Sequence, residues 1–203
     1  VKQAVSLADL VKEAARFALS GSNVTWEFQF QPGLWPVEAD PGQINQVLNN
    51  LIINADQAMP GGGVIRINME NQDVRENEVP GLAMGRFVRL SISDSGIGIS
   101  QEHLARIFDP YFTTKQKGSG LGLATAYSII RRHGGLITVE SKVQKGATFR
   151  IWLPASLNEP KAPKENAPLR SGSGELVLVM DDDPGVRQVL EGMLTRLGYE
   201  VEL

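Results

Sequence analysis

Two short glycine-rich segments constrain the fold of this chain more than any other feature. The first glycine segment, Asp94–Gly98, follows the alternating run FVRLSIS, which predicts a strand. The second glycine segment, Gly118–Gly122, precedes LATAYSIIRRH, where apolar residues recur at helical spacing. Glycines let backbone N–H groups approach a ligand closely, and a helix N-terminus attracts phosphates. The pair therefore predicts a nucleotide site, with the base at one end and the phosphates at the other.

Composition bounds the class of protein. The 203 residues suffice for one full core and part of a second domain. A formal net charge of −3 and the lack of a long basic run give no support for nucleic-acid binding. The absence of cysteine excludes disulfides and thiolate metal sites, and no apolar stretch is long enough to cross a bilayer. We expect a cytoplasmic piece of a longer protein, and that parent could itself be attached to a membrane.

The remaining elements are predicted from periodicity and from turn residues. Helices are expected over residues 5–19, from Asp40-Pro41 to the glycines at 61–63, and after Gly122. Strands are expected over residues 24–30, 34–40, 64–70, 87–93, 136–141 and 147–153. A polar loop is expected at 71–85 and a turn at 144–146. In the helix that Asp40 caps, the apolar stripe comprises Ile44, Val47, Leu48, Leu51, Ile52 and Ala55. Asn50 and Asn54 lie together on one flank of that stripe.

The C-terminal part of the chain differs in composition. Residues 155–174 are rich in proline, serine and charge without periodicity, which is typical of a linker. Residues 175–203 read as an apolar strand ending in three acids, a helix and a second strand, which predicts one truncated, flavodoxin-like βαβ unit. We therefore divide the chain into a domain at 1–154, a linker at 155–174 and the beginning of a second domain at 175–203.

Four motifs of residues 1–154 resemble the ATP-binding domain of sensor histidine kinases. In order they are NQVLNNLIINADQAM, DSGIGIS, IFDPYFTTK and GSGLGLA, which match the asparagine, first glycine, phenylalanine and second glycine boxes of that family. The superfamily also contains DNA gyrase, mismatch-repair ATPases and a heat-shock chaperone. The resemblance implies a two-layer α/β sandwich, the Bergerat fold, in which helices cover one face of a mixed sheet.

The resemblance also implies roles for individual residues. Asp94 would bind the adenine amine, and Asn54, assisted by Asn50, would bind the magnesium ion that bridges the phosphates of ATP. Lys115 and Lys117, in the lid segment (residues 108–117), would neutralise the γ-phosphate, although both could be ordinary surface charges. The other residues expected to contact the nucleotide are Gly96, Gly98, Phe108, Thr114, Gly118, Gly120, Leu121 and Gly122.

One position separates the branches of the superfamily. The ATP-hydrolysing members carry a glutamate that activates water four residues before the magnesium asparagine. Here that position is Asn50, which cannot act as a general base. The sequence therefore favours a kinase that transfers phosphate to a histidine on a dimerisation domain. His103 and His133 lack the context of a phosphoacceptor, so we expect both to be structural or surface residues.

The tail resembles the beginning of a response-regulator receiver domain. That resemblance implies that Asp181 and Asp182 are the acidic pair that binds magnesium, although acids at a helix N-terminus are also favourable against its dipole. The parent would then be a hybrid histidine kinase. Its expected partners are its own histidine-containing dimerisation domain and a receiver domain or response regulator, and the family implies a homodimer.

Three alternatives remain open. The first is an ATPase of the same fold, which Asn50 and the receiver-like tail disfavour. The second is a non-catalytic module that signals through ATP-dependent contact. The third is a protein-serine kinase of the anti-sigma type, which the tail also disfavours.

Overall fold

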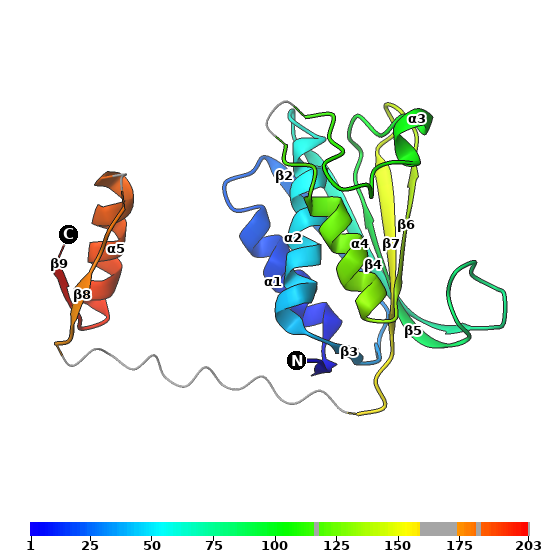
Figure 1. Cartoon of the computed structure of the whole chain (residues 1–203), viewed down its shortest axis with the longest axis horizontal. Coiled ribbons are helices and arrows are strands. Elements are labelled where there is room, and N and C mark those ends of the chain that lie inside the picture. The colour runs from blue at the N-terminus through cyan, green and yellow to red at the C-terminus, as the bar shows by residue number, and fades with distance from the viewer. Residues whose placement is uncertain (116–117, 159–173, 182–183, 203) are drawn as a thin grey trace. The chain divides into compact units, whose positions relative to one another are not determined.

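The computed structural model describes residues 1–115, 118–158, 174–181 and 184–202 (Figure 1). The chain separates into two compact units, Val1–Pro160 and Lys161–Leu203. The first unit contains β1 (Gln3–Val5), α1 (Leu7–Ala18), β2 (Val24–Phe30), β3 (Val37–Ala39), α2 (Pro41–Gln57), β4 (Gly63–Val74), β5 (Gly85–Ser93), α3 (Gln101–Leu104), α4 (Gly122–Arg132), β6 (Leu136–Ser141) and β7 (Ala147–Pro154). The second contains β8 (Leu176–Leu178), α5 (Pro184–Arg196) and β9 (Glu200–Glu202). Most of the predicted linker lies outside the described residues.

A five-stranded sheet and a layer of helices form the first unit. The strand order is β2-β4-β5-β7-β6; β2 pairs parallel to β4, and every other pairing in this sheet is antiparallel. Helices α1, α2 and α4 lie together on one face of the sheet (Figure 1). This arrangement confirms the predicted mixed sheet with helices on one side.

Helix α2 supplies much of the core. All six residues of its predicted apolar stripe are buried. Full burial of a Leu, Ile or Val side chain stabilises a fold by about 1.5–3 kcal/mol, so this stripe holds α2 firmly against the sheet. The helix begins as predicted, because Asp40 accepts a hydrogen bond from the backbone N–H of Gln43 at 3.1 Å and Pro41 occupies the first turn.

The N-terminal region departs from the prediction. The helix expected from residue 5 begins at Leu7, after Ser6 as N-cap, because residues Gln3–Val5 form β1 and pair with β3. The strand expected over 34–40 is shortened to Val37–Ala39. Pro36 has no N–H to contribute to a ladder, which accounts for the late start. Strand β1 has only three residues, too few for its periodicity to be recognised in the sequence.

The β4–β5 hairpin is longer than predicted. Strand β4 continues to Val74 and β5 begins at Gly85, so the expected loop at 71–85 shrinks to 75–84. Phe87, Leu136 and Trp152 bury the end of the hairpin in a small second core with Val74. The predicted strands at 136–141 and 147–153 are present, and they pair through the expected turn.

The second unit has the predicted order of strand, helix and strand. Strands β8 and β9 pair in parallel, with Val177 opposite Val201. Leu176 and Leu178 are 63% and 60% exposed, because one helix and two strands do not cover both faces. The parallel pairing confirms a βαβ unit, whereas its likeness to a receiver domain stays a prediction.

Candidate nucleotide site

Asp94 is held by the backbone through one of its two carboxylate oxygens. Its Oδ1 accepts hydrogen bonds from Gly96 N–H at 2.9 Å and from Ala147 N–H at 3.3 Å. Burial raises the pKa of the Asp94 carboxyl above its ordinary value of 3.8, against the lowering effect of these hydrogen bonds. A carboxylate fixed at one oxygen can present the other to an amine donor.

The glycines beside Asp94 allow the chain to pack against itself. A Cβ on Gly96 would lie 2.5 Å from the carbonyl oxygen of Ala58, at the end of α2, and Ile97 N–H donates to that oxygen at 3.1 Å. Gly98 adopts φ +70°, and a Cβ there would lie 2.2 Å from the carbonyl oxygen of Lys142. These contacts give both glycines a packing role within the protein, independent of any contact with a nucleotide base.

Asn50 connects α2 to the start of α4. Its Nδ2 donates to the carbonyl oxygen of Gly122 at 3.0 Å. Helix α4 begins after Leu121, and no side chain caps it and no acid occupies its first turn. Its first N–H groups therefore remain available to an anion, and the helix dipole favours negative charge there.

Three contacts anchor the first half of the lid segment. Tyr111 N–H donates to the carbonyl oxygen of Gly120 at 3.0 Å, and Gly120 has φ +68° with no room for a Cβ beside the Tyr111 backbone. Phe108 stacks on Tyr127 of α4 with ring centroids 5.3 Å apart. Phe112 packs against the ring of His103. The segment is thus fixed to α4 and to the region of α3.

Lys115 extends from the lid segment to α2. Its Nζ donates to Asn54 Oδ1 at 2.7 Å and to Gln57 Oε1 at 2.6 Å. Partial desolvation lowers the pKa of the Lys115 ammonium, although the side chain remains exposed overall. The amide oxygen of Asn54 suits a hard metal ion as well as an ammonium, so the chemistry of this position fits the predicted magnesium.

The other predicted residues have different positions. Thr114 is exposed in the lid segment, and Gly118 closes its turn through a hydrogen bond from its N–H to Lys115 O at 3.3 Å. Lys117 and Asp182 lie outside the described residues, and Asp181 belongs to the second unit. Within the described ranges, no three His, Cys, Asp or Glu side chains gather in a group that could hold a metal ion.

The sequence did not identify two of the residues that contact the site. Gln57 lies three positions after Asn54 on the same helix, so helical spacing alone would have placed both on one face. Ala147 reaches Asp94 through pairing between β5 and β7. That contact depends on strand register, for which no local signal exists.

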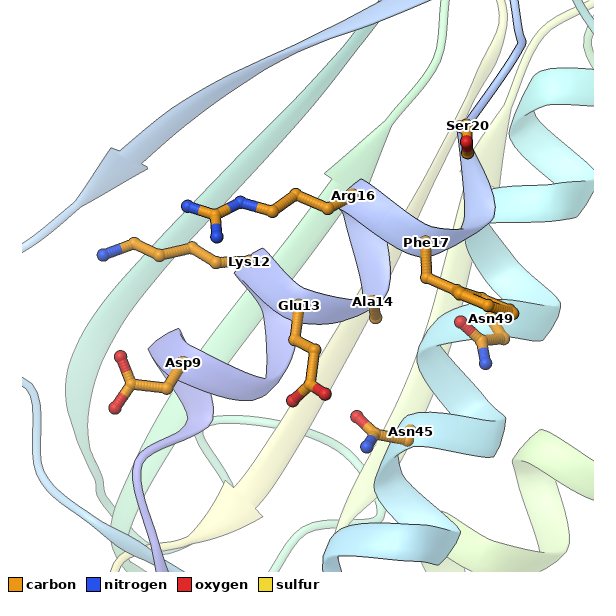
Figure 2. Close-up of a pocket in the computed structure, with 9 residues that line it drawn as sticks. All are labelled: Asp9, Lys12, Glu13, Ala14, Arg16, Phe17, Ser20, Asn45 and Asn49. Carbon is orange, nitrogen blue, oxygen red and sulfur yellow. The ribbon is translucent and has the colours of Figure 1, made fainter. Parts of the chain in front are cut away.

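A separate groove of about 760 Å³ lies between α1 and α2 (Figure 2). Its lining residues are Asp9, Lys12, Glu13, Ala14, Arg16, Phe17, Ser20, Asn45 and Asn49, none of which is a predicted nucleotide residue. Charges of both signs line it and Phe17 is 78% exposed, so it has no single electrostatic character. The backbone donors, together with Asn50 and Asn54, lie instead at the glycine segments, which stay the predicted nucleotide site.

His133 has a structural position. It is 4% exposed, its Nε2 accepts from the backbone N–H of Asp40 at 3.0 Å, and its Nδ1 contacts Ile129 O at 2.8 Å. The side chain thereby ties the end of α4 to the start of α2. His103 packs on the lid segment through Phe112.

Each helix that the structure describes is too short or too polar to span a bilayer.

Residues 39–157 match the family described as histidine kinase-, DNA gyrase B- and HSP90-like ATPases. The chain therefore belongs to that family, whose members bind ATP. Its relatives are sensor kinases, and it carries the ATP-binding catalytic domain of a sensor histidine kinase.

Individual relatives support this assignment. The chain is 39% identical to the sensor kinase CckA of Brucella abortus over 96% of its own length and 22% of that protein's. It is 38% identical to the sensor histidine kinase ZraS of Escherichia coli over 76% of this chain and 31% of the relative. The chain thus spans less than a third of either relative. The catalytic domain of histidine kinase ThkA superposes with a TM-score of 0.63 at 33% identity, covering 76% of this chain and 96% of the other.

Proposed function

We propose that this domain binds Mg–ATP and transfers the γ-phosphoryl group to a histidine of a dimerisation domain in the parent protein. The observation that carries the proposal is the position of Asn50. An amide there cannot accept a proton from water, and its N–H group is already bonded to the carbonyl oxygen of Gly122. The side chain therefore supports the architecture of the site and offers no base for rapid hydrolysis.

The remaining residues divide the recognition of ATP among them. Asp94 offers its second carboxylate oxygen to the adenine amine, and the N-terminus of α4 offers its backbone donors to the phosphates. Asn54 would hold Mg²⁺, which when bound neutralises charge on the phosphates. Lys115 of the lid segment now contacts Asn54, and on ATP binding its ammonium would exchange that amide for a phosphate oxygen.

The second unit suggests a hybrid kinase. Its βαβ order and the acids after β8 support a receiver domain, and the similarity to CckA extends over 96% of the chain, so it includes this unit. The proposed partners are accordingly a receiver domain or response regulator, with the parent acting as a homodimer. In the intact receiver, Asp181 and Asp182 would contribute to a magnesium site.

A titration with a fluorescent ATP analogue, with and without Mg²⁺, tests the proposal when phosphate release is followed in the same samples. We expect saturable binding that Mg²⁺ strengthens, and negligible release of phosphate. Rapid release of phosphate would favour the ATPase alternative. Another residue would then have to act as the general base, because Asn50 cannot. Absence of binding would favour a non-catalytic interaction module.

A further inference from the structure

The ammonium of Lys115 occupies a position between two neutral oxygens of α2. Asn54 Oδ1 and Gln57 Oε1 lie 2.7 and 2.6 Å from its Nζ, and no carboxylate pairs with it among the described residues. An ammonium has three donors and no acceptor, so both amides must turn their oxygens toward it. The two amides, three residues apart on one helix face, therefore form a small cation site.

The turn of the lid segment presents Lys115 to that site. Its backbone N–H donates to Thr113 Oγ1 at 3.1 Å, and its carbonyl oxygen accepts from Gly118 N–H at 3.3 Å. A Cβ on Gly118 would lie 2.5 Å from Thr113 Oγ1, so a larger residue there would displace the hydroxyl that accepts from Lys115 N–H. The backbone at Lys115 is thus fixed from both sides, and its side chain reaches α2 without further rearrangement.

We propose that Gln57 is a positioning residue that holds the Lys115 ammonium on Asn54 until magnesium–nucleotide replaces it. The inference rests on the proposed function, because it takes Asn54 as the magnesium ligand. One amide oxygen cannot serve the ammonium and a metal ion at full strength together, so Lys115 competes with Mg²⁺ for Asn54. Gln57 stabilises the contact between Lys115 and Asn54 by accepting a second hydrogen bond from the ammonium, and it does not itself contact the metal.

The neutral partners make the contact reversible. Hydrogen bonds of a charged donor to amide oxygens are weaker than an ion pair with a carboxylate, and these groups are partly in water. An arriving triphosphate gives Lys115 a stronger partner than either amide. Lys115 can then leave Asn54 to the metal ion, and the lid segment changes its contact from α2 to the nucleotide.

The first arm of the test uses the ligand-free protein. The variant Gln57→Leu removes the acceptor, and Gln46→Leu, at another exposed glutamine of α2, is the matched control. Amide exchange at Lys115 and Gly118, whose N–H groups are bonded within the turn, should be about threefold faster in Gln57→Leu when measured by NMR, and unchanged in the control, as expected for loss of one exposed charge-assisted hydrogen bond. This arm needs no nucleotide, so it tests the contact even if ATP binding fails.

The second arm measures the Mg²⁺ concentration that half-saturates binding of a fluorescent ATP analogue. Gln57→Leu should need about threefold less Mg²⁺ than the unaltered protein, because Lys115 competes less well for Asn54. A purely structural role for Gln57 would weaken binding at every Mg²⁺ concentration without this shift. Failure of the unaltered protein to bind the analogue would refute the proposed function, and the first arm would still decide the ligand-free contact.

A second variant protects the conclusion from misfolding of the first. Lys115→Met removes the same contact from the lid side and should raise exchange at Gly118 as Gln57→Leu does. The double variant should show no further increase, because both substitutions remove one interaction. Unchanged exchange in both single variants, additive effects in the double variant, or an unchanged Mg²⁺ requirement in Gln57→Leu would overturn the proposal.

Discussion

Substitution of Asp94 by asparagine separates recognition of the base from stability of the fold. Oδ1 of the asparagine can still accept hydrogen bonds from the N–H groups of Gly96 and Ala147, which lie 2.9 and 3.3 Å from the present carboxylate oxygen. The second oxygen becomes an NH₂ group and faces a purine amine with a donor instead of an acceptor. The change therefore alters one atom of the site and leaves its backbone contacts in place.

The magnitude follows from the hydrogen bond that is lost. A hydrogen bond to a charged acceptor, together with two donors left facing each other, costs about 1.5–3 kcal/mol, or about 10- to 150-fold in affinity for ATP. The folded protein should not lose stability, because burial raises the pKa of Asp94 and the ionised carboxyl is therefore disfavoured where it lies. We expect the midpoint of thermal unfolding of Asp94→Asn to match or exceed that of the unaltered protein.

Competition against a fluorescent ATP analogue, with ATP and inosine triphosphate as competitors, checks this reasoning. Inosine carries a carbonyl in place of the adenine amine, so the unaltered Asp94 should repel it and the asparagine should donate to it. The variant should therefore lose affinity for ATP while its affinity for inosine triphosphate stays constant or rises. Equal losses for both nucleotides, or undiminished affinity for ATP, would refute base recognition by Asp94.

Three further predictions concern the same region. Gly96→Ala should lower the free energy of unfolding in urea by about 1–3 kcal/mol, because its Cβ would meet the Ala58 carbonyl oxygen at 2.5 Å; unchanged stability would show that the first glycine segment can shift freely. Asn50→Asp should lower the free energy of unfolding by about 1 kcal/mol at neutral pH, because a carboxylate cannot donate to the carbonyl oxygen of Gly122. Acid should restore the lost stability, because the protonated carboxyl is again a donor. A loss of stability that persists in acid would contradict this role of Asn50. Affinity for ATP should fall as the pH drops through the pKa of Asp94, which is raised above its ordinary value of 3.8. Over the same pH range the protein should gain stability, because the buried carboxyl is no longer ionised. Asp94→Asn should show neither pH dependence.

The elements that the sequence predicted well are those with a long or chemically specific signal. Helix α2 has six apolar residues in register and an Asp-Pro start, and all six are buried. The four long antiparallel strands alternate clearly, so their existence was predictable even where their ends were not. The glycine segments were recognised from their clustered glycines beside a strand and a helix, and the structure uses this conformational freedom at Gly98 and Gly120, where φ is +70° and +68°.

The contacts that the sequence did not reveal depend on tertiary placement. Strand β1 has three residues and exists because β3 lies beside it. The hydrogen bond of Asn50 to Gly122 joins residues 72 positions apart. Because the Asn50 amide donates to a backbone carbonyl oxygen at the start of α4, it has a structural role there. Lys115 reaches Asn54 and Gln57 across 61 and 58 positions. A pattern in the sequence can nominate such residues, but it cannot assign the atom that each one engages.

One flank of α2 joins the three loops of the candidate site. Asn50 is hydrogen-bonded to the second glycine segment, and Asn54 is hydrogen-bonded to Lys115 of the lid segment. The carbonyl oxygen of Ala58 accepts a hydrogen bond from the first glycine segment. These positions are four residues apart, so each lies one turn above the last with a drift of about 40° around the helix. Because the opposite face of α2 is buried in the core, the flank is a rigid reference for all three loops. A loop that exchanges its contact with α2 for a nucleotide, as proposed for Lys115, therefore moves against a fixed frame. The hydrogen bond from Tyr111 N–H to the carbonyl oxygen of Gly120 couples that movement to the second glycine segment.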